Sequence, residues 1–319
     1  MPYTSDKPVR LRDFIRVGNL YFSVVGYRNA ESVKALLRYA PDENGDREKD
    51  GVKYKKLSYE EAINVGKRWF SESEGIFRVP REEIDEVFKP EEKLEEVMDS
   101  EVKKVVEFFE GIPREEMGVT GSRLIGLKKE GESDVDFVVY GKYWFIAREK
   151  IRKGIESGKL DEPDEETWER IYKKRNPPLT YEAFLAHERR KFHRAFVGST
   201  YFDLLYVRGY EELERGFPEK IGRKISFRKI RARVVEDRFA FDYPSVYFVE
   251  HEEIEAVVSF THTFAGQVFR GEVLEAAGWV EEIDGAKYLI AGSKREVKDE
   301  YIVSLTLMEK EGIRDFLIS

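Results

Sequence analysis

The stretch from Val119 to Tyr140 reads VTGSRLIGLKKEGESDVDFVVY, and it decides the fold of the middle of the chain. A Gly-Ser turn comes first, and two aspartates that flank a valine follow about a dozen residues later. The apolar run that starts at Phe137 has the composition of a buried strand. Because side chains alternate between the two faces of a strand, Asp134 and Asp136 are predicted to point the same way.

Two carboxylates held this close repel each other. At an effective dielectric of about 20, unit charges about 4 Å apart interact by roughly 4 kcal/mol. A divalent cation is the obvious group to offset that cost, and Mg²⁺ is usually held by one or two carboxylates together with substrate phosphates. The pair Asp134 and Asp136 therefore predicts a magnesium site, with a structural cation as the simpler alternative.

This pattern resembles the nucleotidyltransferase superfamily that includes DNA polymerase β and the CCA-adding enzymes. The family motif is a hydrophobic-x-Gly-Ser turn, then Asp-hydrophobic-Asp on a strand, with a third carboxylate on a later strand. Gly121 and Ser122 after Val119 match its first part, and Asp134 and Asp136 match its second part. More loosely, the whole sequence is similar to archaeal proteins described only as predicted nucleotidyltransferases of unassigned substrate.

The resemblance implies a third acid downstream, and the stretch 200–207, TYFDLLYV, supplies it as Asp203. Aspartate is depleted in strands and rarely buried without a partner, so its place in an apolar run is informative. The alternative is an aspartate at the edge of a strand or in an ion pair with Arg208. Together with the upstream motif, Asp203 is the expected third member of the site.

By resemblance, Asp134 and Asp136 hold two Mg²⁺ ions, with Mn²⁺ as a substitute, and Asp203 completes the site of the metal that activates the acceptor hydroxyl. Gly121 lets the backbone approach the nucleotide closely, and Ser122 can donate a hydrogen bond to a phosphate. Arg123 is a candidate phosphate clamp, because guanidinium pairs bidentately with phosphate. The alternative for Arg123 is a surface arginine near Glu130 or Glu132.

Composition narrows the class of protein. The chain has 319 residues, a net charge of −8 and no cysteine, so a disulfide framework and a thiol nucleophile are excluded. Scarce amides and abundant Glu, Lys and Arg match a thermophilic bias. The chain shows neither an apolar signal core nor the roughly 20 apolar residues that span a bilayer, so we expect a cytoplasmic protein without membrane contact.

The pattern along the chain predicts an α+β protein in three domains: residues 1–88 as an α+β domain, 89–218 as a polymerase β-like nucleotidyltransferase core, and 219–319 as a mostly-β, barrel-like domain. Residues 33–40 are ambiguous between strand and helix. Apolar periodicity predicts several helices. The main expected helices cover residues 58–70, 91–110, 142–157, 163–175 and 180–196.

Residues 220–233 contain seven basic side chains and no acidic one, inside an acidic protein. Such a patch can neutralise a phosphate backbone, so RNA or DNA contact is one interpretation. The other is a solvated strand or linker face that pairs with acids elsewhere. Aromatic residues of the last domain, including Tyr247 and Phe248, are either stacking platforms or core.

The sequence thus favours a metal-dependent nucleotidyltransferase that moves a nucleoside monophosphate from an NTP to a hydroxyl acceptor and releases pyrophosphate. RNA, and tRNA in particular, is the favoured acceptor, with a protein or a small molecule as alternatives. A different class of function remains open at this stage: a non-catalytic RNA-binding or regulatory protein that retains the fold.

Overall fold

The computed structural model describes residues 7–129, 134–214, 217, 222–293 and 299–318. By spatial contact the chain divides into two units. The first joins Met1–Glu162 to His193–Glu214, and the second joins Pro163–Phe192 to Arg215–Ser319. The expected mixture of helices and sheets is confirmed, whereas the three functional domains with boundaries at 88 and 218 stay a prediction.

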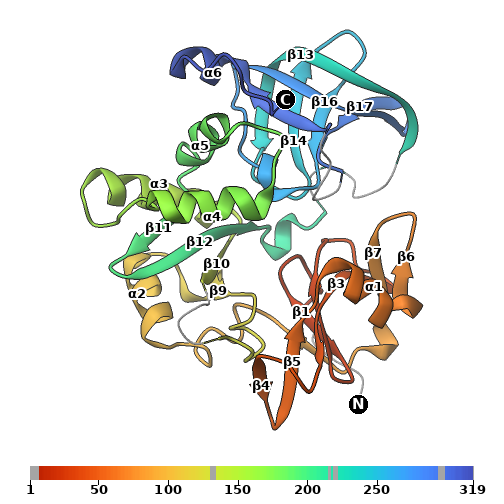
Figure 1. Cartoon of the computed structure of the whole chain (residues 1–319), viewed down its shortest axis with the longest axis vertical. Coiled ribbons are helices and arrows are strands. Elements are labelled where there is room, and N and C mark those ends of the chain that lie inside the picture. Colours follow the sequence, from red (N-terminus) through yellow and green to blue (C-terminus); the bar gives the residue numbers. More distant parts are fainter. Residues whose placement is uncertain (1–6, 130–133, 215–216, 218–221, 294–298, 319) are drawn as a thin grey trace. The chain divides into compact units, whose positions relative to one another are not determined.

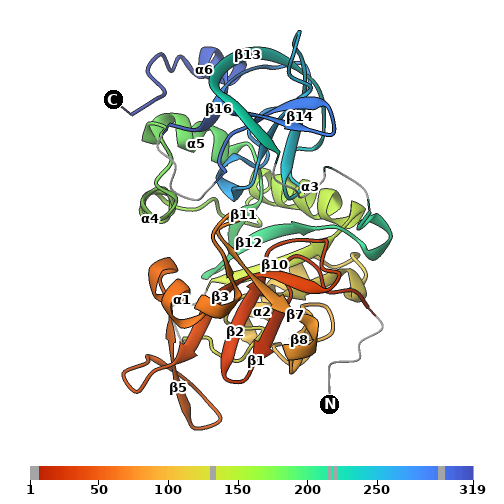
Figure 2. The same ribbon diagram turned by 90° about the vertical axis from the view of Figure 1, so that its right-hand side faces the viewer.

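The first unit begins with a sheet whose main strand order is β4-β5-β3-β2-β1-β8, with β7 also paired to β3 and β6 paired to β7. The ambiguous stretch 33–40 is part of β3. Its side chains alternate, and Val33, Ala35 and Leu37 enter the core. Figure 2 shows β1, β2 and β3 side by side. The strands are β1 (Phe14–Val17), β2 (Leu20–Val24), β3 (Ser32–Pro41), β4 (Arg47–Lys49), β5 (Val52–Lys56), β6 (Phe70–Ser71), β7 (Ile76–Pro80) and β8 (Glu86–Phe88).

Helix α1 (Tyr59–Val65) starts at a capping box made by Ser58 and Glu61, as the sequence predicts. It is shorter than the expected 58–70, because it ends at Gly66, and a 3-10 turn follows. The ring of Phe77 fills the space beside Gly66, where an added Cβ would lie only 2.6 Å from the ring. Packing against β7 therefore ends this helix early.

The second sheet of this unit has the order β11-β12-β10-β9. Helix α2 (Ser100–Phe108) covers only the second half of the expected helix 91–110, because Asp99 caps its start by accepting from two backbone N–H groups. Phe109, just after α2, stacks on Phe137 of the sheet with ring centroids 5.2 Å apart. The strands are β9 (Met117–Val119), β10 (Val135–Tyr140), β11 (Arg194–Val197) and β12 (Thr200–Val207), and α3 (Lys142–Glu156) follows β10.

The second unit contains helices α4 (Glu165–Arg175) and α5 (Tyr181–Arg189). The expected helix 180–196 is wrong in its last part, because the chain reverses direction at Phe192, whose φ of 47° is left-handed. The residues after this reversal form β11 and pair with β12 instead. Among the described residues, no helix is long and apolar enough to cross a membrane.

Six strands and α6 (Leu305–Glu311) complete the second unit. The order β13-β14-β15-β17-β16 closes on itself, because the 17-residue β13 pairs with both β14 and β16. Figure 1 shows β13 as a long curved strand. β15 and β17 are parallel, and the other pairs are antiparallel. This ring has the strand order of the OB-fold barrel. Its strands are β13 (Arg223–Phe239), β14 (Ser245–Glu250), β15 (Ala256–Ser259), β16 (Val273–Ile283) and β17 (Ala286–Ile290), with β18 (Tyr301–Ser304) added to β16.

Candidate active site

Two aspartates face each other across a parallel strand pair in the first unit. β10 and β12 pair in a register that makes Asp136 the direct partner of Asp203. The next residues on the two strands, Phe137 and Leu204, are buried in the core, so the aspartates lie on the opposite face. Neighbouring strands are about 4.8 Å apart, so these two carboxylates share one small region of the sheet.

Asp134 lies just before β10, in line with Asp136. Tyr201 contacts Asp203 directly, because its hydroxyl donates to Asp203 Oδ1 at 3.0 Å. Burial raises the pKa of Tyr201 well above its usual value, and the negative charges of Asp203 and Asp134 raise this pKa further. Asp203 and Asp134 therefore both act on Tyr201, and Asp136 joins this neighbourhood as the register partner of Asp203.

The Gly-Ser turn faces this neighbourhood. Gly121 has a φ of 75°, which favours glycine, and a Cβ there would lie 2.5 Å from Asp136 Oδ2. The turn is fixed to β10, because the Thr120 N–H donates to the Asp136 carbonyl oxygen at 2.9 Å. The Leu127 N–H closes the loop by donating to the Ser122 carbonyl oxygen at 2.8 Å. Gly121 thus lets the Asp136 carboxylate lie directly against the backbone of the turn.

Arg12, which precedes β1, is a residue that the sequence reasoning missed. Burial lowers the pKa of its guanidinium, while the nearby carboxylates of Asp136 and Asp203 raise this pKa. Its backbone is also attached to the turn, because Thr120 Oγ1 donates to the Arg12 carbonyl oxygen at 2.6 Å. No motif in the sequence marks Arg12, since its position depends on how the N-terminal sheet packs.

Other side chains of the N-terminal sheet hold the loop that follows the turn. Arg47 donates to the Leu127 carbonyl oxygen at 2.6 Å, and Lys49 donates to the Ile125 carbonyl oxygen at 3.0 Å. Tyr39 interacts with both the Gly-Ser turn and Asp136. Burial raises the pKa of Tyr39, the cationic side chains Arg47 and Arg38 lower this pKa, and Asp136 raises it, while a hydrogen bond joins Tyr39 to the Ser122 side chain. The first sheet is therefore part of the site.

Asp203 has its own cationic partner. Arg194 of β11 is the direct neighbour of Asp203 in the sheet, and its Nε lies 3.2 Å from Asp203 Oδ1. The alternative ion pair with Arg208 is not the arrangement found, because Arg208 donates to the Leu213 carbonyl oxygen. A divalent cation, the obvious group to offset the repulsion of the acids, is not the only source of positive charge beside them. Arg12 and Arg194 already supply positive charge beside them.

Arg123 is buried and turns toward α2. It forms ion pairs with Asp99 and Glu101, and Lys128 lies 2.7 Å from the same Asp99 carboxylate. Burial opposes ionisation of Asp99, but its hydrogen bonds with Lys128 and the Val102 N–H and the charge of Arg123 hold its pKa at about 2. This arrangement favours a role for Arg123 in fixing the turn to α2. The alternative partners Glu130 and Glu132 lie outside the described residues.

The donor set of the site fits a hard divalent cation in its chemistry. Asp134, Asp136 and Asp203 offer only carboxylate oxygens, which Mg²⁺ and Mn²⁺ prefer. Within the described ranges, however, no three acidic, histidine or cysteine side chains are gathered closely enough to hold a metal as they stand. The bonds from Asp203 to Arg194 and Tyr201 agree with this finding. Metal binding here therefore requires these carboxylates to exchange protein partners for the ion.

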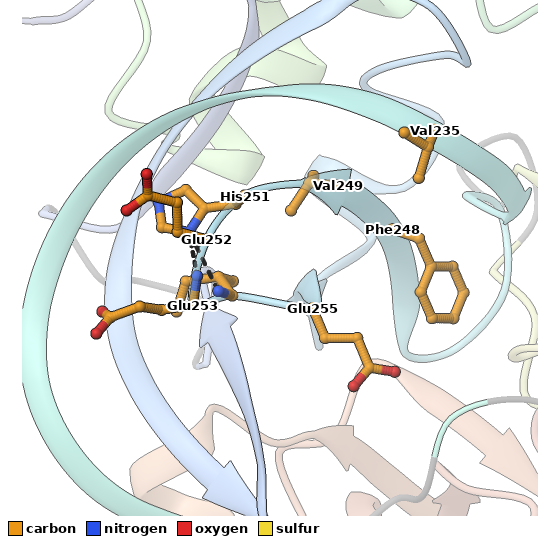
Figure 3. A pocket seen from close by; sticks show the side chains of 8 residues that line it. Val235, Phe248, Val249, His251, Glu252, Glu253 and Glu255 are labelled. Atoms are coloured by element: carbon orange, nitrogen blue, oxygen red, sulfur yellow. Dashed lines mark hydrogen bonds between the residues drawn. The ribbon is translucent and has the colours of Figure 1, made fainter.

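A shallow hollow in the second unit is separate from this site. Its lining includes Phe248, His251 and three glutamates within residues 252–255 (Figure 3). His251 Nδ1 accepts hydrogen bonds from the backbone N–H groups of Glu253 and Ile254, each at 3.1 Å. This histidine therefore caps a turn, and the hollow contains none of the candidate catalytic residues.

Comparison with known proteins places this geometry in context. Residues 99–193 match the family model described as a nucleotidyltransferase domain. This range includes Gly121, Asp134 and Asp136 and ends before Asp203. A curated relative from Methanocaldococcus jannaschii, described as an uncharacterized protein, MJ1086, is 36% identical over 92% of this chain and 98% of its own length. No solved structure matches the chain.

Proposed function

Because this chain belongs to the nucleotidyltransferase family, we propose that it transfers a nucleoside monophosphate from an NTP to a hydroxyl acceptor. The acceptor oxygen attacks the α-phosphorus, the bond to the β-phosphate oxygen breaks, and pyrophosphate leaves, while the hydroxyl proton passes to solvent. The observation that carries this proposal is the register of Asp136 with Asp203, together with the close approach of the Asp136 carboxylate to the turn at Gly121.

We assign metal binding to Asp134, Asp136 and Asp203. Two Mg²⁺ ions, or Mn²⁺ in their place, would supply charge neutralisation of the phosphates and of the attacking and leaving oxygens. Arg12 and Arg194 supply positive charge beside these carboxylates before metal arrives, since each lies near at least one of them.

We assign triphosphate binding to the turn. Gly121 lets the Asp136 carboxylate lie against the turn, so that a phosphate held by the turn would meet the metal-binding acid, and the Ser122 hydroxyl can donate to a phosphate oxygen once it leaves Tyr39. Arg123 acts here by holding the turn on α2 rather than as a direct clamp. Arg12, which precedes β1, lies beside Asp136 and Asp203 and is better placed to face the phosphates.

We assign nucleotide transfer to residues 89–218 and selection of the acceptor to the flanking residues 1–88 and 219–319. RNA, with tRNA as the leading form, is the proposed acceptor because residues 220–233 concentrate basic charge in an otherwise acidic chain. A protein or small-molecule acceptor would not account for this concentration of basic charge.

The test is to incubate the protein with NTPs labelled at the α-phosphate, Mg²⁺ and bulk cellular RNA. Label should enter the RNA with wild-type protein and with Asp161→Asn, an exposed acid in the same unit. Asp136→Asn should abolish the transfer. Label that enters only protein or a small molecule would replace RNA as the acceptor. RNA binding without any turnover would refute the catalytic proposal and favour a binding protein.

A further inference from the structure

One face of the barrel carries a line of cationic and aromatic side chains. We call it the β13 stripe, and it consists of Lys224, Phe227, Lys229, Arg231 and Arg233 of β13 with Trp279 of β16. The register pairs Phe227 with Trp279, Lys229 with Ala277, Arg231 with Glu275 and Arg233 with Val273. Residues of the stripe therefore share one face of the sheet.

The stripe lies on the outside of the barrel. The intervening residues Ile230, Ala232 and Val234 are buried, so they face the interior. Phe227 remains 43% exposed, and the side chains of Lys229 and Arg231 remain 55% and 68% exposed. The half-exposed ring of Phe227 lies beside the partly exposed ring of Trp279, so the two aromatic side chains form a pair on this face.

The cationic side chains are held in place without being neutralised. Glu275 is fully buried beneath the stripe. Its Oε1 lies 3.1 Å from Lys229 and accepts a hydrogen bond from Tyr301, and its Oε2 lies 2.6 Å from Arg231. Lys224 lies 5.1 Å from the centre of the Trp279 ring. The four cationic side chains of the stripe outnumber the two buried carboxylates beneath it, Glu275 and Glu281, so this surface keeps a net positive charge.

The aromatic part of the stripe is suited to stacking. Phe227 and Trp279 meet edge to face, with centroids 5.8 Å apart, and the exposed part of Phe227 lies beside the line of cations. Same-face residues recur about every 6.6 Å along a strand, which is close to the separation of successive phosphates in an extended single strand. Cationic and aromatic side chains in one line are how sequence-tolerant proteins hold single-stranded nucleic acid.

The face of the barrel formed by β14, β15 and β17 is less suited to a ligand. Its outward residues Val246, Ala256 and Val258 are buried in an apolar cluster. Phe217, which precedes the barrel, packs on Tyr288 of this face with centroids 4.7 Å apart. Phe248 belongs to the same cluster and Tyr247 lies fully inside the barrel, so the aromatic residues proposed as stacking platforms are mostly core.

We propose that the β13 stripe is a binding surface for single-stranded RNA, with phosphates on its cations and a base on Phe227 and Trp279. This inference rests on the proposed choice of RNA as acceptor, and it adds the surface and the single-stranded form. Duplex RNA would use the cations but would leave the aromatic pair without a base to stack on.

The test measures fluorescence anisotropy of a labelled single-stranded RNA of about sixteen nucleotides, the upper end of the site size of one barrel. Nucleotide and divalent metal are omitted, so binding is read without turnover. The main variant combines Lys224→Gln with Arg233→Gln and leaves both partners of Glu275 in place. Its matched control combines Lys173→Gln with Lys310→Gln, two exposed lysines of the same unit.

The main variant should weaken binding and flatten the slope of log affinity against log salt by about 1.4, since each lost phosphate contact accounts for about 0.7 on a single strand. Phe227→Ala should weaken binding by about five- to a hundredfold. The control variant should bind like wild type. Circular dichroism of each variant checks that the barrel is folded.

Wild-type affinity and salt slope in both the main variant and Phe227→Ala would overturn the inference, as would equal competition by duplex RNA. These outcomes do not depend on whether the protein has the proposed transferase activity. A protein that transfers label but does not bind through the stripe contradicts this inference alone, whereas a protein that binds RNA through the stripe without turnover contradicts the activity alone.

Discussion

Replacing Arg12 by methionine tests whether the first unit carries its own counter-charge for the acids. The guanidinium of Arg12 is near both Asp136 and Asp203, and burial makes its charge costly without them. Methionine keeps much of the volume and removes the charge. Arg16→Met is the matched control, because Arg16 lies in the adjacent strand β1 and pairs with the half-exposed acids Asp85 and Glu86.

The expected cost follows from the difference between buried and exposed ion pairs. Removing one partner of a buried pair destabilises a protein by about 3–5 kcal/mol, because the other charge stays buried without compensation. An exposed pair contributes about 0–1 kcal/mol. In a unit of this size each kcal/mol shifts the melting temperature by about 2–4 °C. Arg12→Met should therefore lower the Tm by roughly 6–20 °C, and Arg16→Met by less than about 4 °C.

The assay is thermal unfolding with chelator and again with excess Mg²⁺. A cation bound at the acids stabilises the folded state by mass action, and it should restore more stability to Arg12→Met than to wild type, because it replaces the missing charge. Equal Tm values for the Arg12 and Arg16 variants, together with an equal response to Mg²⁺, would refute the assignment of Arg12 as the counter-charge of the site.

The remaining predictions address the turn, the acids and the second unit. Gly121→Ala should destabilise the protein by about 1–2 kcal/mol, because the backbone there is left-handed. It should also lower turnover at least about tenfold, because the new Cβ would meet Asp136. The control is Gly18→Ala, whose backbone is also left-handed but lies in open space: it should lose the same stability in denaturant unfolding and keep full activity. Asp136→Asn should leave the Tm within about 4 °C of wild type in chelator while turnover is lost, since one of two repelling acids is removed; a large drop in Tm would contradict the view that the acids are in excess. Burial lowers the pKa of His187 to about 3, against 6.5 for the unfolded chain, so the free energy of unfolding should fall as the pH is lowered from about 6.5 to about 3. His187→Gln should flatten this dependence in urea unfolding, because an amide can still donate to the Ala183 carbonyl oxygen and accept from the Ser304 N–H; an unchanged pH slope would refute the role of this ring.

The core of the site could be predicted from sequence because local rules determine it. An Asp-Val-Asp before an apolar run fixes which face the carboxylates take, and an aspartate inside the later run 200–207 needs a partner. The structure pairs Asp136 with Asp203 directly. The resemblance to the nucleotidyltransferase family is confirmed by the family match and the archaeal relative.

Features that depend on contacts between distant segments could not be predicted. Arg12 is more than a hundred residues before Asp136 and reaches it only because the N-terminal sheet packs on the loop after the Gly-Ser turn. Arg123 matches the family wording but is drawn to Asp99, whose capping role at α2 was hidden because the helix was expected to start at 91. The face of a strand on which a residue lies follows from the local sequence, whereas the residue that it contacts depends on the tertiary fold.

The same distinction explains the errors in the helices. The stretch 180–196 has helical composition, but α5 ends at Arg189, a left-handed residue follows at Phe192, and the next residues complete the sheet beside Asp203. In residues 220–233 the sequence showed the charge but not its arrangement. Only the pairing of β13 with β16 separates outward cations from inward Ile230 and Ala232 and brings Trp279 beside Phe227.

The most direct test of the central claim is pyrophosphate release from NTP by wild type and by Asp203→Asn, with Mg²⁺ and RNA present. Asp203 lies outside the matched family segment, so its role depends on the strand register alone. We predict Mg²⁺-dependent release by wild type and a loss of about a hundredfold or more in the variant, the scale expected when a group that stabilises developing charge is removed. Release by Asp203→Asn within about tenfold of wild type would contradict the proposed three-aspartate site.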